Sequence, residues 1–249
     1  PSVILQEDTT IKGTITIGYG HTGKINGEKI AWDTKLTLEE AEILLRSDIA
    51  EFEKAVNDSE TDKAAMEKLL NRIPVKPGDV YFIPAKAVHA IGYGCLILEV
   101  QEPTDFTIQP EHWCGDYKLS DHQMYLTLDK ETALSVFDYS YNLERVENEC
   151  KKTPEILYEN SGCRKESLIS KNDTPCFSVE RYVISNGETE CLGAPCIYVV
   201  TEGEGVLTGE GYSKNIKKGD YFFMPYSCHK KIKVQAESLT LAACIPPEV

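Results

Sequence analysis

Two stretches of the sequence share one pattern, "VKPGDVYFIPAKAVHAI" at residues 75–91 and "IKKGDYFFMPYSCHKKI" at residues 216–232. Each contains Lys-x-Gly-Asp, then a run rich in aromatic residues, then a Pro with a His nearby. This pattern predicts a glycine-containing turn that leads into a short β-strand, which the Pro ends. Two such copies, far apart in the chain, favour two related β-domains over a short-period repeat.

Further strand-like segments flank both copies. They are short, rich in β-branched and aromatic residues, and separated by Gly, Pro or Asp, which is typical of sandwiches and small barrels. The segments are "PSVILQ" (1–6), "GTITIGY" (13–19), "GCLILEVQ" (94–101), "FSVERYVIS" (177–185), "CIYVVTEGEG" (196–205) and "SLTLAACI" (238–245). The predicted fold class is therefore mainly β.

Helices are expected between these strands. Thr37 and Glu40 have the spacing of a capping box, and apolar residues then recur at helical spacing up to Phe52. Three more helices are predicted at about 60–71, 130–139 and 143–151, the first of them ending before a proline.

The domain boundary is expected in the polar stretch at residues 150–175. We expect a first domain at 1–155, which carries a helical insertion at about 37–72, and a second domain at 156–249.

Composition excludes several classes of function. The 249 residues are 41% hydrophobic, as in globular proteins with a core, and no apolar run is long enough to cross a bilayer. The formal charge of −14 disfavours nucleic acid and anionic membrane surfaces as partners. No signal peptide is visible, and the nine cysteines form no Cys-x-x-Cys, so reduced thiols in a cytoplasmic protein are expected. The oligomeric state stays open.

The first copy also carries a candidate metal ligand. Residues 78–89 read Gly-x5-Pro-x4-His, which is the spacing of a motif in cupins, small β-barrels that hold a metal in their mouth. In that setting His89 points into the barrel, where a neutral imidazole is a good ligand for a divalent transition metal.

A longer stretch, "NRIPVKPGDVYFIPAKAVHAIGYGCLILEVQEPTDFTIQPEHW" at residues 71–113, closely resembles type I mannose-6-phosphate isomerases. The resemblance continues to the C-terminus through "LDKETALSVFDY" (128–139), "YVVTEGEG" (198–205) and "KKGDYFFMP" (217–225). It implies tandem cupin-like β-barrels, or jelly rolls, with a helical insertion in the first.

The resemblance also implies a reaction, which interconverts mannose 6-phosphate and fructose 6-phosphate. A proton moves between C1 and C2 through an enediol, so the site needs an acid/base and an electrophile for the developing oxyanion. The family holds Zn with a Gln and a His of a Gln-x-His-Pro segment, a Glu, and the His of Val-His-Ala.

Only the last of these zinc ligands maps onto this sequence, to His89, since no Gln-x-His-Pro is present. The simplest expectation is that the chain begins after that segment. The alternative is a degenerate, metal-free member. In this 249-residue form we expect zinc to be weakly held or absent.

Three further residues are candidates for catalysis on the same resemblance. Glu99 matches the pocket glutamate of the family, and strand alternation places it on one face with Ile97 and Gln101, where burial is expected. The family's usual Arg, ten residues later, is replaced here by Gln109. Lys86 stands where the family has a small Gly, and it either supplies a cation beside the metal or points to solvent.

The second copy lacks the candidate ligand. Only three residues separate Pro225 from His229, so the position equivalent to His89 is Lys230. A slip of one residue on a strand moves a side chain to the other face. The second domain is therefore predicted to be a degenerate, metal-free cupin with a structural role.

Residues 13–57 bear a weaker resemblance to phage-type lysozymes, through "TITIGYGHTGK" (14–24) and a helix-like stretch after it. Those enzymes have an Asp six residues before the Thr, and here that position is Thr10, with Asp8 two residues too far. Glycoside hydrolysis needs two carboxylates at a defined separation, and one is absent. His21 is expected at the surface.

Three functions follow from these observations. The first is a zinc-dependent sugar-phosphate isomerase, which the match over 71–113 favours. The second is a non-catalytic cupin that binds sugar phosphate, which the missing ligands and Gln109 favour. The third and weakest is a lysozyme-like hydrolase.

Overall fold

The computed structural model describes residues 2–3, 24–25, 28–29, 36–102, 106–189 and 192–247. The chain divides into two compact units, which are described separately. The first holds residues 1–77, 83–96 and 105–151, and the second holds residues 78–82, 97–104 and 152–249. The expected strand at 13–19, with Asp8, Thr10 and His21, lies outside the described residues.

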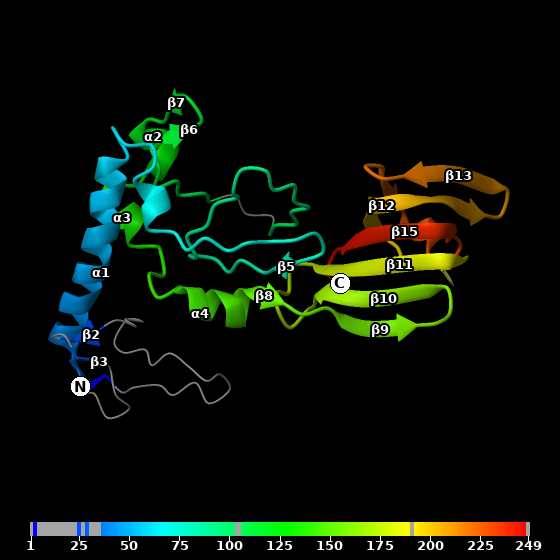
Figure 1. Ribbon diagram of the computed structural model, residues 1–249, viewed down its shortest axis with the longest axis horizontal. Coiled ribbons are helices and arrows are strands. Elements are labelled where there is room, and N and C mark those ends of the chain that lie inside the picture. The colour runs from blue at the N-terminus through cyan, green and yellow to red at the C-terminus, as the bar shows by residue number, and fades with distance from the viewer. Residues whose placement is uncertain are drawn as a thin grey trace. The chain divides into compact units, whose positions relative to one another are not determined.

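The second unit is built on one seven-stranded antiparallel sheet (Figure 1). Its order is β13-β12-β15-β11-β10-β9, and β14 pairs with the first part of β12. The strands are β9 (Glu155–Glu159), β10 (Cys163–Ile169), β11 (Ser178–Glu188), β12 (Cys196–Gly209), β13 (Tyr212–Lys217), β14 (Tyr221–Met224) and β15 (Lys233–Ile245), with a 3-10 turn η3 (Tyr226–Cys228) after β14. The strands expected at 177–185, 196–205 and 238–245 are confirmed as parts of β11, β12 and β15.

Strand alternation gives this sheet one apolar face. Alternate residues of β11, such as Tyr182 and Ile184, share a face and are buried. The core of the unit consists of Cys163, Tyr182, Ile184, Leu192, Cys196, Tyr198, Val200, Leu207, Ile216, Met224, Ile232, Val234, Leu239, Leu241 and Ala243. Because these residues come from strands far apart in sequence, their burial holds the sheet together.

The glycine turn of the second copy precedes β14. Gly219 has φ +91°, a conformation that glycine adopts at little cost. Its N–H donates to the carbonyl of Val200 at 3.0 Å, and the carboxylate of Asp220 accepts from the backbone N–H of Lys217 at 2.9 Å. The Gly-Asp pair therefore shapes the turn, as predicted.

The first unit contains the helices. The longest, α1 (Leu38–Asp58), begins with the predicted capping box: the N–H of Glu40 donates to the Thr37 hydroxyl at 3.2 Å, and the N–H of Thr37 donates to the Glu40 carboxylate at 2.7 Å. The other helical segments are the 3-10 turn η1 (Met66–Lys68), α2 (Asp121–Tyr125), α3 (Lys130–Leu134), α4 (Leu143–Arg145) and the π-helical turn η2 (Val146–Cys150).

The helix expected at 60–71 is largely wrong, because only η1 forms there. The carboxylate of Asp62 accepts from the backbone N–H of Ala64 at 2.9 Å, a local turn that competes with helix formation. The helix expected at 130–139 ends at Leu134, whose carbonyl accepts from the Tyr139 hydroxyl at 2.6 Å.

The core of the first unit lies among these helical segments. It consists of Phe52, Ala55, Val56, Met66, Met124, Tyr125, Ala133 and Leu134. Phe52 packs edge-on against Tyr139 and Phe137, with ring centroids 5.1 Å and 5.6 Å apart. Aromatic pairs prefer this arrangement, so α1 is fixed to the segment after α3.

The remaining strands are two residues long. They are β1 (Ser2–Val3), β2 (Lys24–Ile25), β3 (Glu28–Lys29), β4 (Leu36–Thr37), β6 (Trp113–Cys114) and β7 (Tyr117–Lys118) in the first unit, β5 (Val80–Tyr81) in the second, and β8 (Lys151–Lys152) at the division. The mainly β fold class is confirmed by the chain as a whole. A barrel in the first domain, and the domain limits 1–155 and 156–249, stay predictions.

The strand expected at 94–101 is wrong for this structure. Leu96 is 96% exposed, and residues 94–101 form no strand. Alternating apolar residues form a strand only when another strand takes up their backbone hydrogen bonds. Within the described ranges, no strand pairs with residues 94–101. The described helices include none that is both long and apolar enough to cross a membrane.

Candidate functional site

The loop that follows Pro84 carries two of the predicted site residues. We call residues 85–89 the His89 loop. It begins with a tight turn, in which the N–H of Ala87 donates to the carbonyl of Pro84 at 3.3 Å. Lys86 has φ +73°, a left-handed conformation that costs an L-residue roughly 1–2 kcal/mol. The backbone therefore suits the Gly that the family usually has there.

The orientation of the His89 imidazole follows from one contact. Its Nδ1 lies 2.9 Å from the carbonyl oxygen of Ala87. Because a carbonyl oxygen only accepts, Nδ1 carries the proton and donates it. In the neutral imidazole the lone pair then lies on Nε2, as in many metal-binding or proton-accepting histidines. The ring is exposed, so Nε2 is accessible.

The side chains of Val88 and Lys86 have different environments in the loop. Val88 packs against the core of the first unit, which anchors the middle of the loop. The Lys86 side chain is exposed. The loop therefore presents an ammonium and an imidazole to solvent from one anchored turn.

The other two candidate catalytic residues, Gln109 and Glu99, lie outside the His89 loop. Gln109 is half-buried, and its backbone N–H donates to the carbonyl of Met124 at 2.8 Å, which ties it to α2. Glu99 belongs to the second unit and is exposed. Its expected burial is wrong, because the strand that was to bury it does not form.

The described residues do not by themselves fit a zinc site. No group of three or more His, Cys, Asp or Glu side chains within them lies close enough to hold a metal ion. Catalytic zinc needs about three protein ligands. His89 alone does not supply that set.

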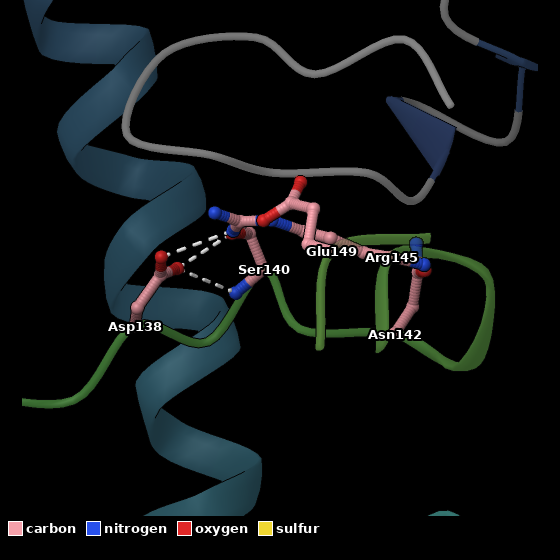
Figure 2. A network of polar contacts seen from close by, with 5 residues as sticks. All are labelled: Asp138, Ser140, Asn142, Arg145 and Glu149. Carbon is pink, nitrogen blue, oxygen red and sulfur yellow. Dashed lines mark hydrogen bonds and ion pairs between the residues drawn. The ribbon is translucent and has the colours of Figure 1, made fainter. Parts of the chain in front are cut away.

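A polar network that the sequence interpretation missed lies in residues 138–149 (Figure 2). The Asp138 carboxylate accepts from the backbone N–H of Ser140 at 3.0 Å and from its hydroxyl at 2.5 Å. The Arg145 guanidinium donates to Asp138 at 3.0 Å and to the Ser140 hydroxyl. Its Nε also contacts both carboxylate oxygens of Glu149, at 2.8 and 2.9 Å. We call these four residues the Asp138 network.

Electrostatics in this network follow from its partial burial. Burial by itself would raise the pKa of Asp138, but hydrogen bonds from Ser140 and Arg145 outweigh it and lower that pKa. For Arg145, burial opposes the charge, while Glu149 and Asp138 raise its pKa. Both groups are therefore charged at neutral pH.

A signal for this network was present in the sequence. In "DYSYNLERVENE" (138–149), Asn142 has the position of a helix N-cap, and Arg145 and Glu149 are four residues apart on one helix face. The N–H of Arg145 donates to Asn142 Oδ1 at 2.9 Å. The contact with Asp138 needs the turn before the helix, which local patterns do not specify.

Comparison with curated proteins finds relatives over about two thirds of this chain. Mannose-6-phosphate isomerase ManA of Bacillus subtilis is 31% identical over 170 residues, which cover 66% of this chain and 49% of that protein. The chain resembles mannose-6-phosphate isomerases. A mannose-6-phosphate isomerase of Streptococcus mutans is 29% identical over 160 residues, or 64% of this chain and 46% of that protein. The chain thus spans about half the length of these mannose-6-phosphate isomerases.

Two other comparisons concern parts of the chain. The family model described as Phage lysozyme matches residues 3–69, the region in which the sequence showed its weaker resemblance. Among solved structures, the polyketide cyclase RemF from Streptomyces resistomycificus is 19% identical with a TM-score of 0.34, covering 39% of this chain and 74% of that one. An RmlC-like cupin from Shewanella frigidimarina is 20% identical with a TM-score of 0.32, covering 39% and 86%.

Proposed function

We propose that this chain takes part in the interconversion of mannose 6-phosphate and fructose 6-phosphate, as an aldose–ketose isomerase. Four curated relatives, at 28–31% identity, carry the name mannose-6-phosphate isomerase or a qualified form of it. The observation that carries the proposal is the His89 loop, in which His89 donates from Nδ1 and Lys86, three residues earlier on the same loop, has a left-handed backbone.

The chemistry assigns these two residues separate tasks. The substrate phosphate is an anion, and a protein of formal charge −14 needs a local cation to hold it. In the proposal the Lys86 ammonium binds a substrate oxygen as a point charge. His89 offers Nε2 as an acceptor of a proton or as a ligand. Glu99, as the acid/base, and Gln109, in place of the usual Arg, stay predictions from the resemblance.

Zinc enters the proposal only through His89. Because the described residues do not form a complete site, His89 is proposed as a single ligand contributed by this chain. We expect the 249-residue protein to retain little zinc after dialysis. Metal analysis that finds one tightly held zinc per chain would contradict this expectation.

A fusion provides the test of the isomerase. The part of Bacillus subtilis ManA that precedes its match is joined ahead of the 249-residue chain, so that α1 and the core of the first unit are kept, and fructose 6-phosphate is measured in a coupled assay with added zinc. We expect turnover in the fusion, and His89→Ala should reduce it to background. His229→Ala, in the second copy, is the matched control and should keep activity. Full activity in the His89→Ala fusion would contradict the proposed role.

Lys86 is tested in the same fusion. Lys86→Ala should lower kcat/KM for mannose 6-phosphate by about 10- to 1000-fold, which is the order of 1.4–4 kcal/mol for a charged contact in a pocket. Lys86→Arg should recover only part of the loss. Lys86→Gly separates the charge from the backbone, since it relieves φ +73° yet removes the ammonium. Unchanged kcat/KM in both Lys86→Ala and Lys86→Gly would show that the Lys86 ammonium does not contact the substrate.

A non-catalytic sugar-phosphate-binding protein is the second candidate. The lack of a metal-holding group among the described residues favours it. Calorimetric titration of the 249-residue chain with mannose 6-phosphate distinguishes the two. Binding to this chain, with no turnover in a folded fusion, would select the second candidate.

The match of residues 3–69 to phage lysozymes favours a third candidate, a muramidase. We expect no clearing of a peptidoglycan suspension, because Thr10 stands where the family's second carboxylate is needed. Thr10→Asp is the informative variant. Clearing by the unmodified chain would overturn this expectation.

A further inference from the structure

One backbone hydrogen bond connects the Asp138 network to the His89 loop. The N–H of Asp138 donates to the carbonyl of Lys86 at 3.0 Å, and both residues lie in the first unit. Lys86 is the residue of the loop with φ +73°. A left-handed conformation in a residue other than glycine persists only where its surroundings hold it. The bond to Asp138 is such a restraint, because it holds the carbonyl group of the same residue.

The position of the Asp138 backbone is in turn fixed by its side chain. The carboxylate accepts two hydrogen bonds from Ser140 and one from Arg145, so it closes a small turn at residues 138–140. The side chains of Asp138 and Arg145 are 30% and 26% exposed. Breaking a partly buried ion pair by removing one partner leaves the other charge uncompensated, which loosens the turn.

Arg145 is held from three further sides. Glu149 binds its Nε, and the guanidinium lies over the Tyr141 ring with Cζ 4.0 Å from the centroid. Asn142 caps the start of its helix. The planar guanidinium contacts Asp138, Glu149 and the Tyr141 ring simultaneously, whereas the ammonium of a Lys is a point charge without that shape.

We propose that Asp138 and Arg145 are positioning residues that set the conformation of the His89 loop. Glu149 orients Arg145, Arg145 orients Asp138, and Asp138 holds the carbonyl of Lys86. The loop conformation then decides where the Lys86 ammonium and the His89 imidazole point. The value of this arrangement for catalysis rests on the proposed function, but the coupling itself does not.

The test uses the 249-residue chain, followed by NMR. Arg145→Gln removes the ion pair, and Arg72→Gln is the matched control, because Arg72 pairs with Glu67 on an exposed surface of the same unit. We expect the amide hydrogen of Asp138 to exchange at least about tenfold faster in Arg145→Gln, with shifted amide signals at residues 85–89. Arg72→Gln should change neither, and the amide of Val56 in α1 should stay protected in both variants.

Two further variants keep the test decisive. Asp138→Asn keeps the shape and removes the charge, and it should reproduce the effect even if Arg145→Gln does not fold. Arg145→Lys should restore only part of the Asp138 protection, whereas a need for charge alone would give full restoration. Unchanged exchange at Asp138 and unchanged signals at 85–89 in a folded Arg145→Gln or Asp138→Asn chain would overturn the inference. An inactive fusion with these NMR effects present would instead count against the isomerase.

Discussion

The two copies of the Gly-Asp pattern begin alike and then diverge. Gly78 and Gly219 both have φ +91°. After Gly219, four residues form β14, which pairs with β12 from Cys196↔Met224 to Val199↔Tyr221. After Gly78, only Val80–Tyr81 form a strand. Local sequence therefore specifies the turn, whereas the length of the strand depends on a partner that takes up its hydrogen bonds.

The histidines of the two copies also differ. Nδ1 of His229 accepts from the N–H of Ala194 at 3.1 Å, and its ring stacks on Tyr226 with centroids 5.7 Å apart. Nδ1 of His89 instead donates to a carbonyl, and its ring is exposed. The two rings are thus opposite tautomers. The Nδ1 lone pair of His229 accepts a hydrogen bond within its own unit, whereas the proposal assigns the Nε2 lone pair of His89 to a ligand.

The largest difference in stability is expected at matched apolar positions five residues after each glycine. Met224 is 5% exposed in the core of the second unit, and Ile83 is 39% exposed. Met224→Ala should lower the free energy of unfolding by about 2–4 kcal/mol, and Ile83→Ala by less than about 1 kcal/mol. Urea denaturation followed by circular dichroism measures both. Equal losses would mean that the first copy is packed like the second.

The glycines provide a sharper comparison of the turns. Gly78→Ala and Gly219→Ala should each lower the free energy of unfolding by roughly 1–2 kcal/mol, because both need φ +91°. Sterics add little, since a Cβ at Gly78 would lie 3.5 Å from Arg181 Nη1 and one at Gly219 would meet nothing within 4 Å. Thermal melts of the two variants check this. A Gly78→Ala variant as stable as the unmodified chain would show that the first turn is not formed.

The smallest expected effects have opposite signs. Lys86→Gly should raise the free energy of unfolding by about 0.5–1 kcal/mol, because it relieves the left-handed conformation. Ser227 is the matched position of the second copy and lies in the 3-10 turn η3. Ser227→Gly should lower the free energy of unfolding by about 0.5 kcal/mol, since glycine loses more conformational freedom on folding. Paired urea titrations give the sign of each change in the free energy of unfolding. A less stable Lys86→Gly chain would contradict the claim that the backbone of Lys86 is strained.

The sequence predicted the structural features that depend on residues close together in the chain. The capping box at Thr37 and Glu40, and the three strands rich in β-branched residues that became β11, β12 and β15, are of this kind. Segment 94–101 has the same alternation, yet forms no strand, because alternation does not say whether a partner is present.

The site was predictable only in part, for a related reason. The motif spacing predicted His89 as a candidate ligand, which stays a prediction. The resemblance indicated that Lys86 replaces a Gly, and the structure shows the positive φ that suits a Gly there. The role of Asp138 depends on a contact between segments distant in sequence, through a backbone N–H that every residue except proline has. Side-chain identity carries no signal for such a bond.

The central claim is that the first copy carries a ligand-binding loop and the second copy is structural. Titration of the ¹⁵N-labelled 249-residue chain with mannose 6-phosphate, followed by amide NMR shifts, tests it most directly. We predict saturable shifts at residues 85–89 and none at the matched residues 226–230. Shifts confined to residues 226–230, or no shift at either copy, would contradict the claim.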